Sequence, residues 1–396
     1  MPGGVTAPRG FRAAGVAAGI KANKGLDLAL IVSEMPAQAA AVFTTNLAVA
    51  APVVVSREHL ARSGGTARAI IVNSGCANAC TGDDGLQVAR DMAAETAALV
   101  ACPVEQVLVA STGVIGVSLP IDKIRRALPD AIRSLAADQG SLAARAIMTT
   151  DPFPKEAARA IAIGGRNAAI GGIAKGSGMI EPMMATMLGF VTTDAVVPGR
   201  LLDRALREAV DDTFNAITVD GECSTNDCVM LLANGASGAV VDDSTYGAFV
   251  GGLTAVCHDL ALGIVRGGEG ATKLIKVTVT GAASSADARR AAKAIANSPL
   301  VKTAIHGGDP NWGRLIAVAG RAGVAFELAR AAVTIGTVVL FKDGRPYDEA
   351  APLAATYLKG RDLTVAVDLG AGSAASTVWT CDLSAEYVRI NADYRT

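Results

Sequence analysis

Short apolar runs alternate with longer helical segments along most of this chain, and this alternation limits the possible folds strongly. The predicted strands are apolar, rich in branched side chains, and bounded by glycine or polar residues. They are Leu28–Ser33, Ala69–Asn73 and Gln106–Ala110. The predicted helices carry apolar residues at the spacing of one helix face. They are Gly85–Val100, Pro198–Ile217 and Tyr246–Val265. Such an alternation predicts an α/β architecture with sheets inside and helices outside.

The pattern changes beyond about residue 274, where predicted strands become more frequent. The elements predicted there are the strands Leu274–Thr280, Ala332–Phe341, Leu363–Leu369 and Thr377–Leu383 and the helix Ser285–Ala296. No low-complexity linker separates the two parts. We therefore expect a catalytic α/β domain over residues 1–280, layered in an α-β-β-α manner, and a smaller C-terminal α+β domain over residues 281–396.

Composition argues against several classes of protein. Of the 396 residues, 51% are apolar and 18% are charged, a balance that favours a compact oligomer over a disordered chain. The net charge is −1 and no basic block occurs, so we expect no nucleic-acid partner. No apolar run approaches the roughly 18–20 residues that cross a bilayer, and no secretory signal is visible, so we expect no membrane association. The seven irregularly spaced cysteines fit reduced thiols in a cytoplasmic protein.

The segment Lys175–Leu188 contains a candidate nucleophile, Thr186, directly behind the small residue Ala185. A threonine hydroxyl is a weak nucleophile unless a base lies beside it. Cleavage of the chain between Ala185 and Thr186 would free the α-amine of Thr186. An α-amine titrates at about 7.7–8.0, which suits a general base at working pH. We therefore predict self-cleavage at this bond and Thr186 as the nucleophile that it releases.

Three other segments gather polar residues, and each has a structural alternative. Thr112 and Gly113 follow a predicted strand, where donors could stabilise a tetrahedral oxyanion or simply form a turn. Thr149 and Thr150 place two hydroxyls before an Asp-Pro pair, and the structural alternative for this segment is a helix end or a turn. Glu269 lies among glycines, where a carboxylate suits either a ligand contact or a solvated turn.

Two further segments and the end of the chain also have two interpretations. Asp220–Asp227 suits hydrogen-bonded support of a neighbouring site as well as it suits direct catalysis. His306–Arg314 is either a packed structural loop or the rim of a site. Chain ends usually fray, so the residue types alone do not indicate a site role for Asn391 or Thr396.

Several site motifs are absent from the sequence. No serine lies in a GxSxG motif, which disfavours a nucleophile-elbow hydrolase. The three histidines are scattered without HExxH, and Cys76 and Cys80 have no partner pair, so we expect no zinc site. The sequence also lacks GxxxxGK[ST], and no GxGxxG follows a strand. We therefore expect neither a metal nor a nucleotide cofactor.

Eight segments together resemble the ornithine acetyltransferase family, also called the glutamate N-acetyltransferase or ArgJ-type family. They are Asn73–Gly82, Ser111–Gly116, Ala146–Asp151, Lys175–Leu188, Gly267–Lys273, Asn297–Ala304, Gly308–Arg314 and Asn391–Thr396. They follow one another over nearly the whole chain, and the segment around Thr186 is the most specific. The sequence departs from the family at Cys76, where many members have asparagine. It departs again at Met183, where a polar Asn or Asp is usual.

The resemblance implies a ping-pong acetyl transfer in arginine biosynthesis. Thr186 would take the acetyl group from N2-acetylornithine, and glutamate would then attack the acetyl-enzyme. Self-cleavage by an N→O acyl shift would leave chains 1–185 and 186–396, which the family assembles as an α2β2 heterotetramer. Some members are bifunctional and also use acetyl-CoA as a donor.

The resemblance also assigns roles by position. Thr112 and Gly113 would form the oxyanion hole. The residues expected to contact the amino-acid substrate are Thr149 or Thr150, Lys175, Thr186, Glu269, Asn391 and Thr396. The chemistry of the charged residues agrees, because Lys175 can pair with a substrate carboxylate and Glu269 with the ornithine ammonium.

Two other functions remain open on the sequence. An N-terminal-nucleophile amidase or aminopeptidase would use the same threonine with water as the acceptor. A non-enzymatic protein would bury Thr186 as a core hydroxyl and would keep the chain intact.

Overall fold

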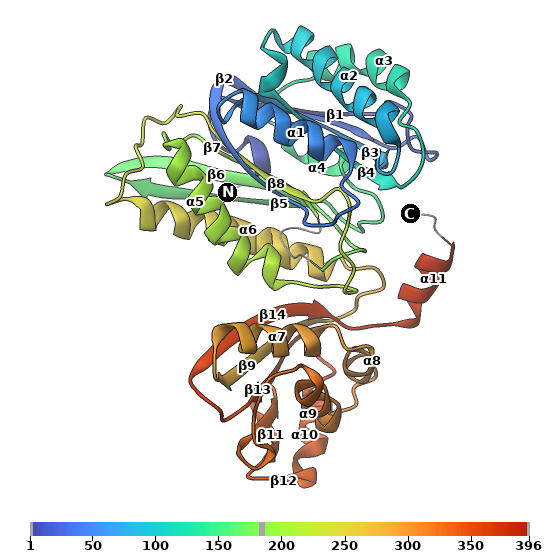
Figure 1. Ribbon diagram of the computed structural model, residues 1–396, viewed down its shortest axis with the longest axis vertical. Coiled ribbons are helices and arrows are strands. Elements are labelled where there is room, and N and C mark those ends of the chain that lie inside the picture. The colour runs from blue at the N-terminus through green and yellow to red at the C-terminus, as the bar shows by residue number, and fades with distance from the viewer. Residues whose placement is uncertain (1–2, 182–186, 394–396) are drawn as a thin grey trace. The chain divides into compact units, whose positions relative to one another are not determined.

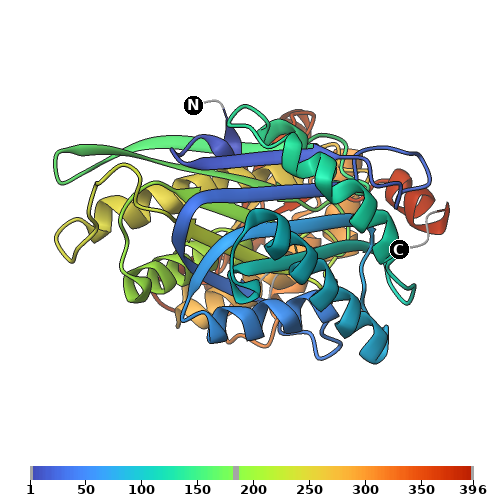
Figure 2. The ribbon, with the colours of Figure 1, turned by 90° about the horizontal axis from the view of Figure 1, so that it is seen from above.

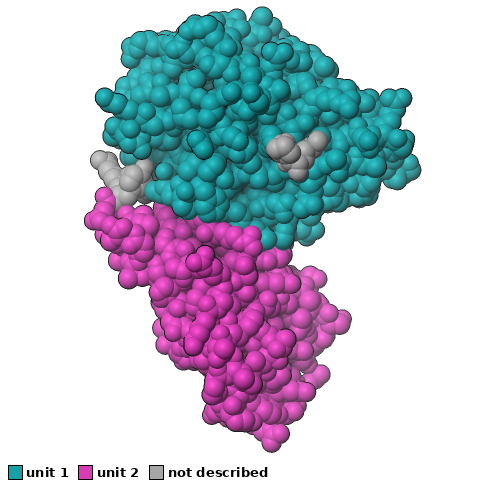
Figure 3. All heavy atoms as spheres, turned by 180° about the vertical axis from the view of Figure 1, so that it is seen from behind, with its two compact units in different colours: residues 1–215, 222–264, 396 teal, residues 216–221, 265–395 magenta. Residues whose placement is uncertain are grey.

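A computed structural model of the protein describes residues 3–181 and 187–393. These residues form two compact units, which are coloured separately in Figure 3. Unit 1 comprises residues 3–215 and 222–264, and unit 2 comprises residues 216–221 and 265–393. Each unit has its own sheet.

The sheet of unit 1 has eight strands in the order β4-β3-β2-β8-β7-β6-β5, and β1 pairs with β2 off this path. The strands are β1 Phe11–Val16, β2 Leu28–Phe43, β3 Thr66–Cys76, β4 Val107–Val114, β5 Lys155–Ile163, β6 Arg166–Lys175, β7 Leu188–Thr193 and β8 Cys228–Ala233. The long β2 joins the two halves of the sheet, because its first part pairs with β3 and its last part with β8. Its register against β3 shifts between Val32 and Ala37, and such irregularities allow a strand to bend.

Two apolar clusters produce the layers of unit 1. The first brings the two halves of the sheet together, with Leu108 of β4 in the same cluster as Phe190 of β7 and Met230 of β8. The second packs Ile71 of β3 against helices, including Met92 of α2. The helices are α1 Ala51–Arg62, α2 Gly82–Val100, α3 Ile121–Arg133, α4 Gly140–Ala146, α5 Gly199–Asp212 and α6 Tyr246–Arg266. Helices α1–α3 flank one half of the sheet and α5 and α6 the other (Figures 1 and 2), which confirms the predicted layered α/β class.

Helix α6 is the one helix among the described residues that is long and apolar enough to cross a membrane by length and composition. Its inward residues pack on the sheet instead. Phe249, Leu253 and Val256 are fully buried, and Gly252 lies so close to Ile161 of β5 that an added Cβ would meet its Cγ2 at 2.5 Å. These contacts identify α6 as a core helix of unit 1.

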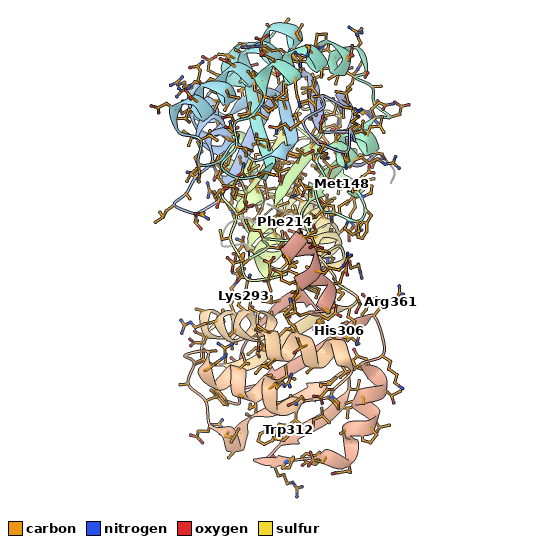
Figure 4. All side chains as sticks on the ribbon, turned by 90° about the vertical axis from the view of Figure 1, so that its right-hand side faces the viewer. Met148, Phe214, Lys293, His306, Trp312 and Arg361 are labelled. Atoms are coloured by element: carbon orange, nitrogen blue, oxygen red, sulfur yellow. The ribbon has the colours of Figure 1, made fainter. Side chains whose placement is uncertain are left out.

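Unit 2 has a six-stranded sheet in the order β12-β11-β10-β13-β9-β14. Its strands are β9 Leu274–Ala282, β10 Ala332–Ile335, β11 Val338–Lys342, β12 Arg345–Pro346, β13 Asp362–Asp368 and β14 Ala374–Cys381. Its helices are α7 Ser285–Ala296, α8 Pro299–Gly307, α9 Trp312–Arg321, α10 Ala351–Tyr357 and α11 Ala385–Asp393. Trp312, labelled in Figure 4, stacks on Phe341 with the ring centroids 4.9 Å apart. Short 3-10 helices occur at Gly4–Thr6, Val104–Gln106, Phe214–Ala216, Leu328–Arg330 and Asp348–Ala350.

Two sequence predictions about unit 2 need correction. The boundary lies at residue 265 and not at 281, because β9 is an inner strand of the unit 2 sheet between β13 and β14. The predicted strand Ala332–Phe341 is a hairpin of two strands, since the chain turns at Gly336, whose φ is +62°. Because the residues on both sides of this turn are apolar, the apolar pattern of the sequence did not indicate that the strand ends there.

Candidate active site

The candidate site of unit 1 lies at the ends of β6, β7 and β8. Lys175 ends β6 and pairs with Leu188, the first residue of β7, and Leu188 pairs with Cys228, the first residue of β8. The predicted cleavage point, Ala185 and Thr186, precedes Leu188 by a few residues and lies outside the described residues. Met183 lies outside them as well.

The predicted oxyanion turn follows from a close contact between two strands. Gly113 of β4 pairs with Gly75 of β3, and its φ is +130°, a conformation that favours glycine. A Cβ at Gly113 would lie 2.4 Å from the carbonyl carbon of Gly75 and 2.6 Å from the backbone nitrogen of Cys76. Gly113 is therefore required by the packing of its own turn.

A buried polar network holds this turn in place. The Ser111 hydroxyl donates to Asn73 Oδ1 at 2.6 Å. The amide of Asn226 donates to the carbonyl oxygens of Ser111 at 2.9 Å and Ala77 at 2.6 Å. The Thr225 hydroxyl in turn donates to Asn226 Oδ1 at 2.6 Å. For the Asp220–Asp227 segment, these contacts favour the supporting role over direct catalysis.

Lys175 links the end of β6 to this turn. Its side chain is buried, and its ammonium donates to the hydroxyl oxygen of Thr112 at 3.2 Å. Because the ammonium supplies this hydrogen, the hydroxyl keeps its own hydrogen to donate elsewhere. The structure thus brings Thr112, Gly113 and Lys175 together.

Asp151 is a buried carboxylate that the sequence analysis did not select. It accepts backbone hydrogen bonds from Thr149 at 2.9 Å and Gly176 at 2.7 Å, and it forms a buried ion pair with Lys155. Burial alone would raise the pKa of Asp151, but Lys155 and Lys175 outweigh it and lower that pKa to about 2. Burial lowers the pKa of Lys155 more than Asp151 raises it. Asp151 therefore ties the segment of Thr149 to the strand end at Lys175.

The two threonines before Asp151 differ in their contacts. The hydroxyls of Thr150 and Ser177 lie 2.6 Å apart and share a hydrogen bond. Within residues 3–181 and 187–393, the hydroxyl of Thr149 makes no side-chain hydrogen bond. Thr149 is therefore the better placed of the two to bind a ligand.

Asp227 is the second buried acid of this region. It is fully buried, and burial raises its pKa well above the usual value even though Lys175 and hydrogen bonds from Ser224 act in the opposite direction. One carboxyl oxygen, Oδ2, has no hydrogen-bond partner in the described part of the chain. These conditions favour the protonated, uncharged form of Asp227.

Unit 2 brings two other predicted residues together. The amide of Asn391, on α11, donates to Glu269 Oε2 at 2.7 Å, and Glu269 is buried at 6% exposure. Thr396 lies outside the described residues. The predicted segment His306–Arg314 has structural contacts, since Asn311 caps α9 and the Arg314 guanidinium donates to the carbonyl of Leu300 at 2.6 Å. The described residues contain no group of three or more His, Cys, Asp or Glu side chains able to hold a metal ion.

The fold is of the layered α/β class, and unit 1 brings Thr112, Gly113 and Lys175 to one place, an arrangement that suits an acyl-transferring enzyme. The chain belongs to the ArgJ family, whose model matches residues 12–396. It is 49% identical over 403 residues to the arginine biosynthesis bifunctional protein ArgJ of Symbiobacterium thermophilum, covering 100% of this chain and 99% of that protein. It is 50% identical over 392 residues to the Geobacter sulfurreducens ArgJ protein, covering 98% and 99%.

A solved structure agrees with this assignment. The crystal structure of the arginine biosynthesis bifunctional protein of Bacillus halodurans is 43% identical, with a TM-score of 0.51. The match covers 53% of this chain and 100% of that chain.

Proposed function

We propose that the protein transfers the acetyl group of N2-acetylornithine to glutamate in arginine biosynthesis, through an acetyl ester on Thr186. The contact between Lys175 and Thr112 carries this proposal, because it joins a carboxylate-binding cation to an oxyanion donor in one buried site. The curated relatives from Symbiobacterium thermophilum and Geobacter sulfurreducens are named as bifunctional proteins of arginine biosynthesis. We place the enzyme in the cytoplasm, in keeping with its substrates.

The first half-reaction forms the acetyl-enzyme. The hydroxyl oxygen of Thr186 attacks the acetyl carbonyl carbon, and the free α-amine of Thr186 takes the hydroxyl proton. The resulting oxyanion accepts hydrogen bonds from the Thr112 hydroxyl and the Gly113 backbone. The bond from the carbonyl carbon to the ornithine nitrogen breaks, and that nitrogen takes the proton from the α-ammonium as ornithine leaves.

The second half-reaction runs the same steps with a new amine. The α-amine of glutamate attacks the ester carbonyl and passes a proton to the α-amine of Thr186, while the same donors hold the oxyanion. The bond from the carbonyl carbon to the Thr186 oxygen then breaks, and that oxygen takes the proton back from the α-ammonium. The products are N-acetylglutamate and free Thr186. No metal or other cofactor takes part in either step, and acetyl-CoA serves as an alternative donor.

We propose that different residues bind the negatively and the positively charged groups of the substrates. Lys175 pairs with the α-carboxylate that both amino acids carry, and the Thr149 hydroxyl adds a hydrogen bond. Glu269, oriented by Asn391, receives the ornithine ammonium. Thr396 contributes a further contact to the bound amino acid.

Self-cleavage and assembly belong to the same proposal. Cleavage before Thr186 leaves a second chain of 211 of the 396 residues, which is 53% of the whole. The full length of the solved Bacillus halodurans chain covers the same fraction of this sequence, which supports a cleaved mature form. We propose that the two chains remain together as an α2β2 heterotetramer.

Two measurements test the proposed function. A denaturing gel should show two bands for the wild type and one band of 39.9 kDa for Thr186→Ala. Thr150→Ala, a threonine substitution away from the cleaved bond, should still give two bands. A single wild-type band would contradict self-cleavage and would support a non-enzymatic protein.

The second measurement separates transfer from hydrolysis. The enzyme is given acetylornithine with and without glutamate. Transfer predicts that N-acetylglutamate and sustained ornithine release appear only with glutamate. Equal acetate release in both mixtures would support the amidase alternative and refute the transferase.

A further inference from the structure

The segment between β1 and β2 is folded around one buried carboxylate. Asp27 is fully buried and accepts backbone hydrogen bonds from Ala18 at 2.5 Å, Ile20 at 2.5 Å and Lys21 at 2.9 Å. The ammonium of Lys123 also donates to the carbonyl of Gly19 at 2.5 Å. These bonds fix the backbone of Lys21, although the segment contains no helix or strand.

This segment lies against the strand that supports the oxyanion turn. The backbone nitrogen of Ser74 donates to the carbonyl of Asp27 at 2.9 Å. An added Cβ at Gly75 would meet the Lys21 Cγ at 3.0 Å, so the lysine stem lies directly over Gly75. Gly75, which is on β3, pairs with Gly113 of β4. Gly75 thus lies between the Lys21 side chain and Gly113 of the turn that we assign to the oxyanion.

The ammonium of Lys21 lies in the electrostatic field of the candidate site. Its pKa is lowered by burial, while Asp27 and Asp151 act to raise it and Lys175 acts to lower it. The charges of Asp151 and Lys175 therefore both act on the ammonium of Lys21.

The neighbouring carboxylates of Asp27 and Asp151 accept hydrogen bonds from groups other than the Lys21 ammonium. Asp27 accepts three backbone hydrogen bonds, and Asp151 is paired with Lys155. Lys21 forms no ion pair within the described chain, and its ammonium donates one hydrogen bond, to the carbonyl of Leu26 at 2.7 Å. Two of its three N–H donors thus remain available for a ligand.

We propose that Lys21 binds the side-chain carboxylate of glutamate and so determines which acceptor is used. This inference rests on the proposed function. Ornithine and glutamate share an α-carboxylate, which Lys175 binds, but their side chains end in opposite charges. The side-chain carboxylate of the acceptor therefore needs a cation of its own, distinct from the one that binds the α-carboxylate. Lys155 is excluded because its ammonium is buried against Asp151.

The test measures each half-reaction separately in Lys21→Met, Lys21→Arg and Lys24→Met. Lys24 is exposed in the same segment and serves as the matched control. Formation of the acetyl-enzyme from acetylornithine is followed by mass spectrometry, and its discharge is followed at increasing glutamate. Lys21→Met should raise the glutamate KM about 10- to 100-fold, as expected for loss of a charged hydrogen bond. Acetyl-enzyme formation should change less than about twofold, because that step does not use the side-chain carboxylate.

The other two variants and a second acceptor, glutamine, test whether the charge of Lys21 is the cause of the change in glutamate KM. Lys21→Arg should recover most of the glutamate affinity, and Lys24→Met should match the wild type. With glutamine, which lacks the side-chain charge, Lys21→Met and wild type should discharge at similar rates. An unchanged glutamate KM, or equal slowing of both half-reactions, would overturn the proposal. Failure of the wild type to form any acetyl-enzyme would instead refute the proposed function itself.

Discussion

The ammonium of Lys175 and the hydroxyl of Thr112 lie 3.2 Å apart, and this hydrogen bond joins the ends of β6 and β4. The ammonium has no lone pair and can only donate, so it fixes the hydroxyl as the acceptor. The hydroxyl hydrogen is therefore left to point toward a ligand. The same contact sets the position of Lys175, which we propose binds the substrate carboxylate.

Replacement of Thr112 by valine should lower kcat about 100- to 1,000-fold, the usual effect of losing one oxyanion donor. Valine keeps the branched shape of threonine but has no hydroxyl. Thr112→Ser keeps the hydroxyl and should retain most of the activity. Steady-state kinetics with acetylornithine and glutamate provide the measurement. Equal loss of activity in both variants would indicate that shape, and not the hydroxyl, matters at this position.

Replacement of Gly113 by alanine should destabilise the protein and abolish activity, whereas Gly116→Ala should have a mild effect. Both glycines have positive φ, +130° and +77°, but only Gly113 faces backbone atoms within 3 Å of an added Cβ. Strain alone at Gly116 costs about 1–2 kcal/mol, and overpacking at Gly113 adds about 1–3 kcal/mol. Urea unfolding of the two variants measures the difference. Similar midpoints for both would show that the strand pair can separate at little cost.

The sequence predicted the layered α/β class and most of the regular elements that it specified. Strands β3, β4 and β13 and helices α2, α6 and α7 carry clear apolar periodicity, and their positions were predicted within a few residues. Strands β5 and β6 were missed, because β5 is half exposed and rich in alanine, and β6 is rich in alanine and glycine. Such residues have little strand preference of their own, and here pairing with neighbours decides their conformation.

The candidate site was predictable where the motifs are local. Thr112, Gly113 and Lys175 were placed by resemblance, and the structure brings them together. Lys21 and Asp151 act through contacts between distant segments, which a linear pattern does not report. The backbone donors around Asp27 exist only in the folded chain, so no residue spacing in the sequence could indicate them.

Replacement of Asn226 by alanine should reduce both stability and kcat. Its amide donates to two buried carbonyls, Ser111 and Ala77, and each would be left without this donor. Leaving a buried acceptor unsatisfied costs about 1–3 kcal/mol. The Asn46 amide donates to one carbonyl, that of Cys223 at 2.9 Å, and its Oδ1 accepts from the Ala48 backbone. Asn46→Ala removes one donated bond instead of two, so it is a suitable comparison and should cost less. Thermal unfolding and kcat are measured for both; a lower kcat for Asn46→Ala than for Asn226→Ala would contradict a role for Asn226 in holding the oxyanion turn.

Asp151 should make the stability of the protein depend on pH in the acid range. Its pKa in the folded state is about 2, below the value of about 3.9 for an unfolded chain. A depressed carboxyl pKa stabilises the folded state above pH 4, and this stabilisation is lost as the pH falls from about 4 to about 2. The expected contribution is on the order of 2 kcal/mol. The lowered pKa of Lys155 adds no slope in this range, because lysine stays protonated in the unfolded chain.

The pair variant Asp151→Asn with Lys155→Met isolates this effect, since it removes both charges together. The free energy of unfolding is measured by urea titration from pH 5 to pH 2 for this variant and for the wild type. All other carboxylates contribute to both proteins, so the difference between the two curves should shrink or reverse as the pH falls. Asp151→Asn alone should be less stable than the pair variant at pH 7, because it leaves the Lys155 ammonium buried without its partner. A difference that stays constant from pH 5 to pH 2 would show that Asp151 is not held ionised in the folded protein.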